Sequence, residues 1–347
     1  MGNGLADKRE YVAIDVLRFI AAYLVMSIHY VIFIDVNEEL NFWFIQVVCR
    51  LAVPFFFLVS GYFAANKLQD KIKTYAYVKR ILLMYIIYTV VYLPSFIKDN
   101  QKLGHTSEEM VMIFLKDFFL VGSYFHLWYF LALIVGIVIL YIMINWLKWE
   151  EKKILIVTGV FYGIGTLGNA YRNIWMNITV VENIWEAYET LFQTTRNGIF
   201  FAPFLLAIGY CVRKNARKIT YKRYWVYAIL LFVIMNIEEY FARAITEHSG
   251  QSMLFITPFV VLAVFLAACF IRIPEKLVPI GIFLRNMSVV MYGLHIYMHD
   301  TYGIELSGGM PYGFPYFLMM AKRVTIVALV VVGVSRIKIF SWLKYLY

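Results

Sequence analysis

Long apolar stretches recur along this 347-residue chain, and the charged residues gather in the short connections between them. An apolar run of about twenty residues is the length that an α-helix needs to cross the hydrocarbon core of a bilayer. Hydrophobic residues make up 62% of the chain and the mean hydropathy is +0.70, which is more apolar surface than a soluble fold of this length can bury. The sequence therefore predicts an integral membrane protein with an all-α fold.

Reading each apolar run as one span predicts about ten transmembrane helices. Neither an internal repeat nor a Pro-rich or Ser-rich linker divides the chain, so a single membrane domain covering residues 1–347 is expected. The expected spans are 12–34, 40–64, 81–97, 126–147, 154–170, 196–212, 224–243, 252–271, 287–303 and 315–335.

The net charge of +10 is distributed unevenly among the connections. Dense sets of Lys and Arg occur between Lys67 and Arg80 and between Arg213 and Arg223, whereas the alternate connections carry few. The positive-inside rule then places both termini and the even-numbered connections in the cytoplasm. In this setting the positive charge sets the topology, and no nucleic-acid partner is expected.

The first apolar run contains two polar side chains, Arg18 and His29, with ten residues between them. A guanidinium and an imidazole are both costly in hydrocarbon, so their presence on one membrane helix indicates a site. Along a helix they are about 16 Å apart, which could link chemistry at one membrane surface to chemistry deeper in the bilayer. Alternatively, Asp15, three residues before Arg18 on the same helix face, neutralises it as a structural pair.

The second run combines a charge with a helix breaker. Pro54 removes one backbone hydrogen bond and predicts a kink toward the bundle interior, with Arg50 about one turn away. Ser60 and Gly61 allow another helix to approach closely. Arg50 then either contributes to a polar site or only extends its guanidinium toward the membrane surface beside a structural kink.

Five segments, taken in order, resemble the membrane acyltransferase-3 family, and they span essentially the whole chain. They are Ile14–Ala21 followed by His29 (an Arg-x10-His signature), Arg50–Tyr62, Lys79-Arg80, His126–Tyr129 and Arg285–His295. The resemblance implies an enzyme that transfers an acyl group, commonly acetyl, from cytosolic acyl-coenzyme A to a hydroxyl of an extracytoplasmic glycan or other cell-envelope acceptor. A multi-pass protein of the bacterial cytoplasmic membrane is then expected, with the lipid bilayer, acyl-coenzyme A and a carbohydrate or other hydroxyl acceptor as partners.

In that interpretation three cations, Arg18, Lys79 and Arg80, bind the phosphates of the coenzyme. Arg18 also belongs to the catalytic pair with His29. The alternative for Lys79 and Arg80 is that they serve only to fix the topology.

His29 is the expected general base. A neutral imidazole is cheaper to bury than a charge, and it titrates near neutral pH, so it can take a proton from an acceptor hydroxyl that attacks the thioester. The alternative is a core histidine hydrogen-bonded to a neighbouring carbonyl.

Further polar residues are predicted at the outer level of the bundle, where they would bind the acceptor. They are Arg50, His126, Arg196, His295 and Glu239. His126 has the alternative of belonging to an interfacial aromatic belt with Trp128 and Tyr129. No metal is expected, because His295 and His299 have the spacing of zinc ligands but neither an HExxH motif nor a third ligand.

The segment Thr195–Phe204 carries a second resemblance, to the membrane portion of vancomycin-resistance serine racemases, which is thought to move serine across the membrane. In this transport alternative, Arg18, Arg50 and Arg196 would hold a substrate carboxylate and the histidines would relay protons. A structural membrane partner without activity is the third possibility, but it leaves the basic residues inside the membrane unexplained.

Overall fold

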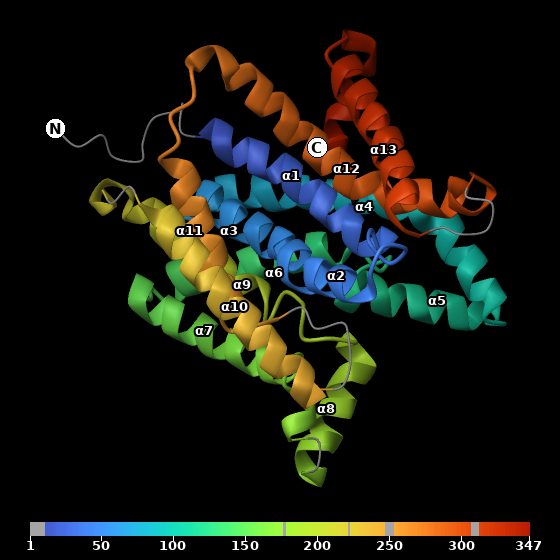
Figure 1. Cartoon of the computed structure of the whole chain (residues 1–347), viewed down its shortest axis with the longest axis horizontal. Helices are drawn as coiled ribbons and strands as arrows, with labels where there is room; N and C mark the ends of the chain where they lie inside the picture. The colour runs from blue at the N-terminus through green and yellow to red at the C-terminus, as the bar shows by residue number, and fades with distance from the viewer. Residues whose placement is uncertain (1–10, 176–177, 221–222, 247–252, 307–311) are drawn as a thin grey trace.

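The computed structural model describes residues 11–175, 178–220, 223–246, 253–306 and 312–347, and within them the secondary structure is entirely helical. The α-helices are α1 (Tyr11–Tyr30), α2 (Glu38–Trp43), α3 (Ala52–Ala64), α4 (Lys71–Lys102), α5 (Ser107–Lys116), α6 (Trp128–Tyr141), α7 (Glu151–Leu167), α8 (Thr179–Phe192), α9 (Ala202–Lys214), α10 (Tyr224–Thr246), α11 (Thr257–Cys269), α12 (Val278–Leu306) and α13 (Phe314–Val334). Short π- and 3-10 segments include η2 (Phe44–Val48), η3 (Cys49–Leu51), η4 (Asp117–Val121), η5 (Ile142–Trp146) and η9 (Lys338–Leu346). Figure 1 shows α1, α3 and α12 running side by side, with α10 and α11 on one flank and α13 on the other.

Seven helical segments in the described part of the chain are long and apolar enough to cross a membrane. They are Tyr11–Tyr30, Glu38–Ala64, Lys71–Lys102, Trp128–Trp146, Tyr224–Ile245, Glu275–His299 and Phe314–Val334. This multi-pass membrane architecture agrees with the prediction from the apolar runs. The other three expected spans contain α7, α9 and α11, which are helices of 17, 13 and 13 residues.

The expected span 196–212 differs most from the prediction, because its first turn is not helical. Residues Arg196–Phe201 form turns, and α9 begins only at Ala202, with Pro203 in its first turn. The Asn197 side chain accepts hydrogen bonds from the amides of Ile199 and Phe200 at 2.9 and 3.2 Å, which holds these residues out of a continuous helix. Non-helical backbone at membrane depth is tolerated only where protein surrounds it, and Asn197 is indeed buried.

The irregularity predicted near Pro54 lies in the turns before the proline. The chain passes from α2 through the π-helical segment η2 and the 3-10 segment η3 before α3 begins at Ala52. Pro54 has no amide hydrogen to pair with the carbonyl of Arg50, and its ring crowds that carbonyl, so regular hydrogen bonding fails there.

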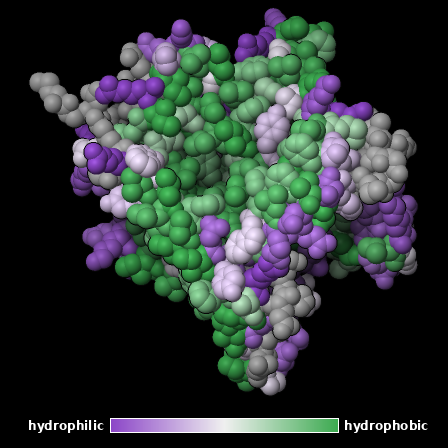
Figure 2. All heavy atoms as spheres, in the orientation of Figure 1, coloured by the Kyte–Doolittle hydropathy of each residue, from purple (hydrophilic) through white to green (hydrophobic). Residues whose placement is uncertain are grey.

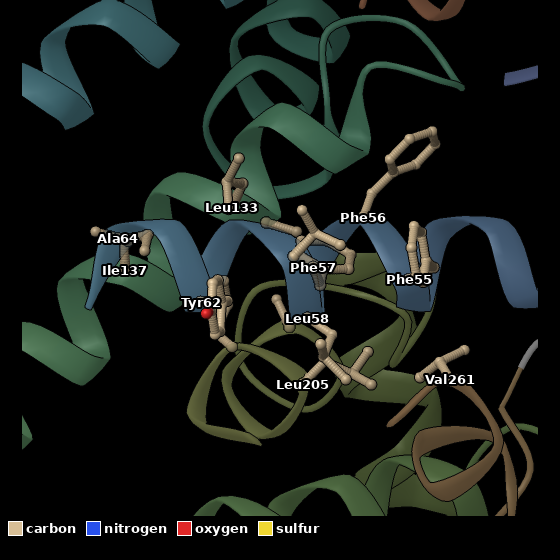
Figure 3. Close-up of a cluster of buried hydrophobic side chains, with 14 of the residues drawn as sticks. Phe55, Phe56, Phe57, Leu58, Tyr62, Ala64, Leu133, Ile137, Leu205 and Val261 are labelled. Atoms are coloured by element: carbon tan, nitrogen blue, oxygen red, sulfur yellow. The ribbon is translucent and has the colours of Figure 1, made fainter. Parts of the chain in front are cut away.

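The core is densest where α3 meets α9, and glycines make that approach possible. A Cβ at Gly61 would overlap the backbone carbonyl of Leu206, and one at Gly209 would overlap the carbonyl of Leu58. Such close approach of small residues is typical of helix packing in membranes. Figure 3 shows Phe57, Leu58 and Leu205 packed between these helices.

The outer faces of the bundle are apolar. Helix α10 exposes a row of large hydrophobic side chains. Figure 2 shows hydrophobic residues over much of this face of the molecule, with hydrophilic ones around its edges and in a band across its lower middle. The exposed residues of α10 include Trp225, Ile229, Leu230, Val233, Ile234, Ile237 and Phe241. A helix that is apolar on its exposed side fits contact with lipid.

Candidate functional site

Helix α1 carries both polar residues of its apolar run toward the protein interior. Arg18 and His29 are eleven residues apart, which is three helical turns plus about 20°, so they lie on one face of the helix. The Arg18 Nη1 atom is 3.7 Å from Asp15 Oδ1, and their side chains are only 17% and 4% exposed. Asp15 therefore pairs with Arg18, as the structural alternative predicted, but other cations accompany them.

A group of basic side chains surrounds Arg18, and we call it the cationic cluster. Arg285 lies close enough to Arg18 for their like charges to interact, and Lys67 interacts in the same way with Arg80 and Arg285. Asp15, which interacts with both Arg18 and Arg285, is the carboxylate that faces them. The cluster is defined by Arg18, Lys67, Arg80 and Arg285. Two of these cations interact with Asp15, so the four together leave a net positive charge, which suits an anionic ligand.

The expected set of phosphate-binding cations differs in part from this cluster. Arg18 and Arg80 belong to it, and Arg80 Nη2 also donates to the backbone oxygen of Tyr347 at 2.6 Å. Lys79 and Arg80 are both exposed, and of the two it is Arg80 that interacts with Lys67. Sequence reasoning did not name Lys67 or Arg285 as site residues. The available signal for Arg285 was a cation in the apolar run that ends at His295.

Three histidines from different parts of the chain meet at the other end of α1, and we call them the histidine cluster. The ring of His295 lies between the other two, with centroids 5.1 Å from His29 and 5.3 Å from His126. His126 and His295 are fully buried, and His29 is half-buried. His295 Nδ1 lies 2.8 Å from the carbonyl of Tyr292, while its Nε2 is buried without a hydrogen bond among the described residues. This ring therefore has one unused polar atom inside the protein.

Helix α4 holds the segment of α12 that carries His295. The Tyr92 hydroxyl donates to the carbonyl of Gly293 at 2.9 Å and accepts from the amide of Tyr297 at 2.8 Å. In a regular α-helix these two backbone groups bond each other. The Tyr92 hydroxyl therefore contacts both partners of one backbone hydrogen bond of α12. Gly293 is required at this point because a Cβ there would overlap the ring of Tyr88.

Two arginines and a carboxylate lie near His29. Arg50 interacts electrostatically with Arg196 and with Glu239, and His29 interacts with both arginines. The Arg50 Nε atom donates to Gln46 Oε1 at 3.2 Å. Glu239 is 1% exposed, and its Oε2 has no hydrogen bond among the described residues. The structure thus brings Arg50, Arg196, His126 and His295 into interaction with His29, and Glu239 joins this group through Arg50.

The non-helical segment before α9 positions Arg196. Thr195 Oγ1 donates to the carbonyl of Gly165 at 2.8 Å, and Asn197 Nδ2 donates to the carbonyl of Thr194 at 2.9 Å. Between these two anchors, the Arg196 guanidinium lies over the ring of Trp128 with its Cζ 4.8 Å from the ring centroid. Stacking on an indole ring holds a guanidinium in a fixed plane, which orients its N–H groups.

Glu238 and Glu239 are adjacent in sequence but have different structural partners. Both oxygens of Glu238 accept backbone hydrogen bonds, from Phe255 at 2.7 Å and from Ile256 at 2.9 Å. Tyr171 also donates to Glu238. Glu238 therefore fixes the start of α11, whereas Glu239 is buried and interacts with Arg50.

A path of hydroxyl-bearing side chains lies between the two clusters. Tyr129 interacts with Arg18, and its hydroxyl is 3.3 Å from Ser60 Oγ. The ring centroid of Tyr129 is 5.3 Å from that of Tyr292, which in turn is 6.0 Å from that of His295. The interior between Arg18 and the histidine cluster is therefore amphipathic rather than purely hydrocarbon.

No group of three or more His, Cys, Asp or Glu side chains able to hold a metal ion occurs in the described parts of the chain. His299, expected to be a poor zinc ligand, has its Nδ1 2.7 Å from the Tyr316 hydroxyl. The three cysteines are free and buried. The polar side chains described at the histidine cluster and around Arg50 carry imidazole, guanidinium and carboxylate groups.

A helical bundle whose first membrane helix joins a cationic cluster to a buried histidine cluster defines a polytopic membrane protein with a polar interior site. The chain belongs to the acyltransferase-3 family, because a family model described as an acyltransferase domain matches residues 11–336. This match covers the motifs on which the resemblance rested.

The curated relatives are named as racemases, not as acyltransferases. An amino-acid racemase of Enterococcus faecalis is 29% identical over 221 residues, which are 63% of this chain and 30% of that protein. A serine/alanine racemase of Enterococcus gallinarum is 28% identical over 260 residues, covering 73% of this chain and 36% of that protein. The chain thus spans about a third of the length of these relatives. No solved structure matches it.

Proposed function

We propose that this protein is a membrane O-acyltransferase that moves an acyl group, in the simplest case acetyl, from cytosolic acyl-coenzyme A to a hydroxyl of a cell-envelope acceptor. The observation that carries the proposal is the placement of Arg18 and His29 on one face of α1, the first in a cluster of four cations and the second in the histidine cluster. Family membership supports the reaction class.

The cationic cluster is the proposed donor site. Coenzyme A carries a 3′-phosphate and a diphosphate, and guanidinium groups bind such oxygens through paired, charge-assisted hydrogen bonds. Arg18, Arg80 and Arg285 supply three guanidinium groups, and Lys67 adds an ammonium. This assignment places the start of α1 and of α4 at the cytoplasmic surface, in agreement with the orientation expected from the positive-inside rule.

His29 is the proposed general base. As the acceptor oxygen bonds to the thioester carbonyl carbon, its proton passes to a ring nitrogen of His29, and the carbon–sulfur bond then breaks to release coenzyme A as a thiolate. The proton leaves the imidazolium to the thiolate or to water, which returns the base to its starting state. Arg50 and Arg196 lie near enough to stabilise negative charge that develops on the carbonyl oxygen.

The acceptor is proposed to bind among Arg50, Arg196, Glu239, His126 and His295. His295 Nε2 and Glu239 Oε2 are buried polar atoms with no hydrogen bond in the described structure, and both can pair with hydroxyl groups. These groups suit a polyhydroxylated acceptor such as an extracytoplasmic glycan, since a sugar offers several donors and acceptors at once.

The test uses the purified full chain in proteoliposomes, radiolabelled acetyl-coenzyme A and a crude envelope fraction as the acceptor source. We expect His29→Ala to lower acyl transfer by about 10²–10⁴-fold, the usual contribution of a general base. His105→Gln is the matched control, because His105 lies in the α4–α5 connection, where its ring bonds Asn100. Wild-type turnover by a folded His29→Ala protein would refute the proposal.

A second candidate function is transport of a small amino acid such as serine. The relatives are named as racemases of amino acids, and Arg50 and Arg196, which lie close enough to interact, can bind an amino-acid carboxylate. Uptake of labelled serine by proteoliposomes that contain no coenzyme A, lost in Arg196→Ala, would support this alternative. Absence of uptake alongside acyl transfer would exclude it.

A further inference from the structure

A cavity of about 210 Å³ lies beside the polar site and shares one residue with it. It is enclosed by η4, by one face of α6, by the end of α8 and by the turns before α9. Its lining residues are Phe119, Leu120, Val121, Trp128, Leu131, Ala132, Val135, Phe192, Asn197, Gly198 and Ile199. Trp128, whose ring lies under the Arg196 guanidinium, forms part of the wall.

The cavity offers an apolar surface to its occupant. Apart from the indole N–H of Trp128, the polar side-chain group in the lining is the Asn197 amide, which is already used within the loop. Water needs two to four polar partners to occupy a protein cavity. An apolar cavity of about 150 Å³ stays dry and takes up benzene, so this larger one fits a hydrocarbon group.

The rim of the cavity carries exposed apolar side chains. Its α6 residues, from Trp128 to Val135, belong to the first two turns of a membrane-crossing helix. At the rim, Phe119 is 65% exposed, and Val138, one turn further along the same α6 face, is 40% exposed. Hydrocarbon chains are therefore the medium that surrounds the opening.

We propose that this cavity binds one hydrocarbon chain of a phospholipid from the surrounding bilayer. The chain would lie along the α6 face between η4 and the turns before α9, and it would contact Trp128. Because Trp128 also supports Arg196, an occupied cavity holds that ring in place at the edge of the polar site. Lipid binding in this cavity does not require that the protein transfers acyl groups.

A phospholipid is favoured over the acyl chain of a coenzyme A donor by where the two sites lie. The cations that can bind the coenzyme come from α1, α4, α12 and the segment after α3, and none of them lines the cavity. The opening instead meets exposed apolar side chains on the outside of the bundle.

The test is photo-crosslinking of the full chain in nanodiscs that contain a phospholipid with a diazirine near the end of one acyl chain. Adducts are located by peptide mass spectrometry. We expect adducts on residues 119–121 and 197–199 at higher yield than on the exposed face of α10, which serves as an internal reference for ordinary lipid contact. Equal or lower yield in the cavity segments would overturn the proposal.

Two variants give the matched comparison. Leu131→Trp fills the cavity and should lower its adducts about fivefold, a change of about 1 kcal/mol in occupancy. Val138→Trp adds the same side chain outside the cavity on the same helix face, and should leave the yield unchanged. Val121→Phe fills the cavity from the opposite wall and replaces Leu131→Trp if that variant does not fold. Equal yields in the filled and control variants would refute binding in the cavity.

A competition experiment distinguishes the source of the chain. Excess octanoyl-coenzyme A should leave the phospholipid adducts unchanged, because its binding site lies elsewhere. Loss of the cavity adducts on its addition would overturn the phospholipid assignment and assign the cavity to the donor's acyl chain.

Discussion

The hydroxyl of Tyr92 in α4 donates a hydrogen bond to the carbonyl of Gly293 in α12 at 2.9 Å, and this contact lies less than one turn from His295. The same hydroxyl accepts from the Tyr297 amide. One side chain thus bonds both the carbonyl and the amide of one helical step next to the central residue of the histidine cluster. A second contact, from the Tyr30 hydroxyl to the carbonyl of His295 at 2.7 Å, fixes the same turn from α1.

We expect Tyr92→Phe to destabilise the protein by about 0.5–1.5 kcal/mol, the usual net contribution of one hydrogen bond. The loss stays modest because the freed carbonyl of Gly293 and amide of Tyr297 can pair with each other. Denaturant or thermal unfolding in detergent measures the change. Tyr240→Phe is the control, since Tyr240 is 62% exposed on α10. Equal stability of the two variants would contradict the bridging role.

The contact between α3 and α9 predicts that Gly209→Ala destabilises the fold by about 1–3 kcal/mol, as overpacking does. The added Cβ would overlap the Leu58 carbonyl, and a backbone group cannot rotate away as a side chain can. Gly333→Ala is the control, because nothing lies within 4 Å of a Cβ at that position of α13. The expected unfolding midpoints are lower for Gly209→Ala and unchanged or higher for Gly333→Ala. The reverse order would exclude close packing at this contact.

Arg285→Ala is expected to raise the KM for acetyl-coenzyme A about tenfold, a loss of about 1.4 kcal/mol of binding, while kcat changes little. The reason is its place in the cationic cluster, away from the histidines. Arg272→Ala removes an exposed arginine just before α12 and serves as the control. Steady-state kinetics with varied donor concentration separate the two constants. A fall in kcat alone would show that Arg285 acts at another step.

Helix α5 gives a pH-dependent prediction outside the membrane spans. The backbone amide of Thr106 donates to Glu109 at 2.8 Å, and this bond holds the pKa of that carboxyl below its usual value of 4.5. The charged form is favoured in the folded state, so its stabilisation is present above about pH 4.5 and is lost as the pH falls through the lowered pKa.

Hydrogen exchange of α5 amides, corrected for intrinsic rates, should therefore show loss of protection as the pH falls from about 6 to about 3.5. Glu109→Gln keeps an acceptor for the Thr106 amide but cannot titrate, so its protection should not depend on pH in this window. The same pH dependence in both proteins would assign the effect to another group.

Much of the membrane architecture follows from the sequence. Apolar runs of sufficient length predicted a multi-pass helical bundle, since hydrocarbon accepts little else. Pro54 predicted an irregular second helix, because proline lacks the amide hydrogen that the helix needs. The spacing of Arg18 and His29 is itself enough to place both on one helix face. Family membership also followed from motifs read along the chain.

The sequence was less informative about the lengths of the helices and about which basic residues belong to the cationic cluster. The expected span at 196–212 includes turns, because the Asn197 side chain competes for backbone amides before α9. Lys79 looked equivalent to Arg80, but successive helical residues point in directions about 100° apart, so only Arg80 joins the cluster.

The sequence by itself thus determined that the chain forms apolar helices with an arginine and a histidine on the same side of the first one. Only the tertiary structure decided that His295 lies between His29 and His126, and that Arg285 joins Arg18. The physical reason is that contact with lipid stabilises any apolar helix face to a similar extent, so it does not select which helices pack together. Which helices become neighbours depends on close contacts, such as those at Gly61, Gly209 and Gly293, between residues that are distant in the chain.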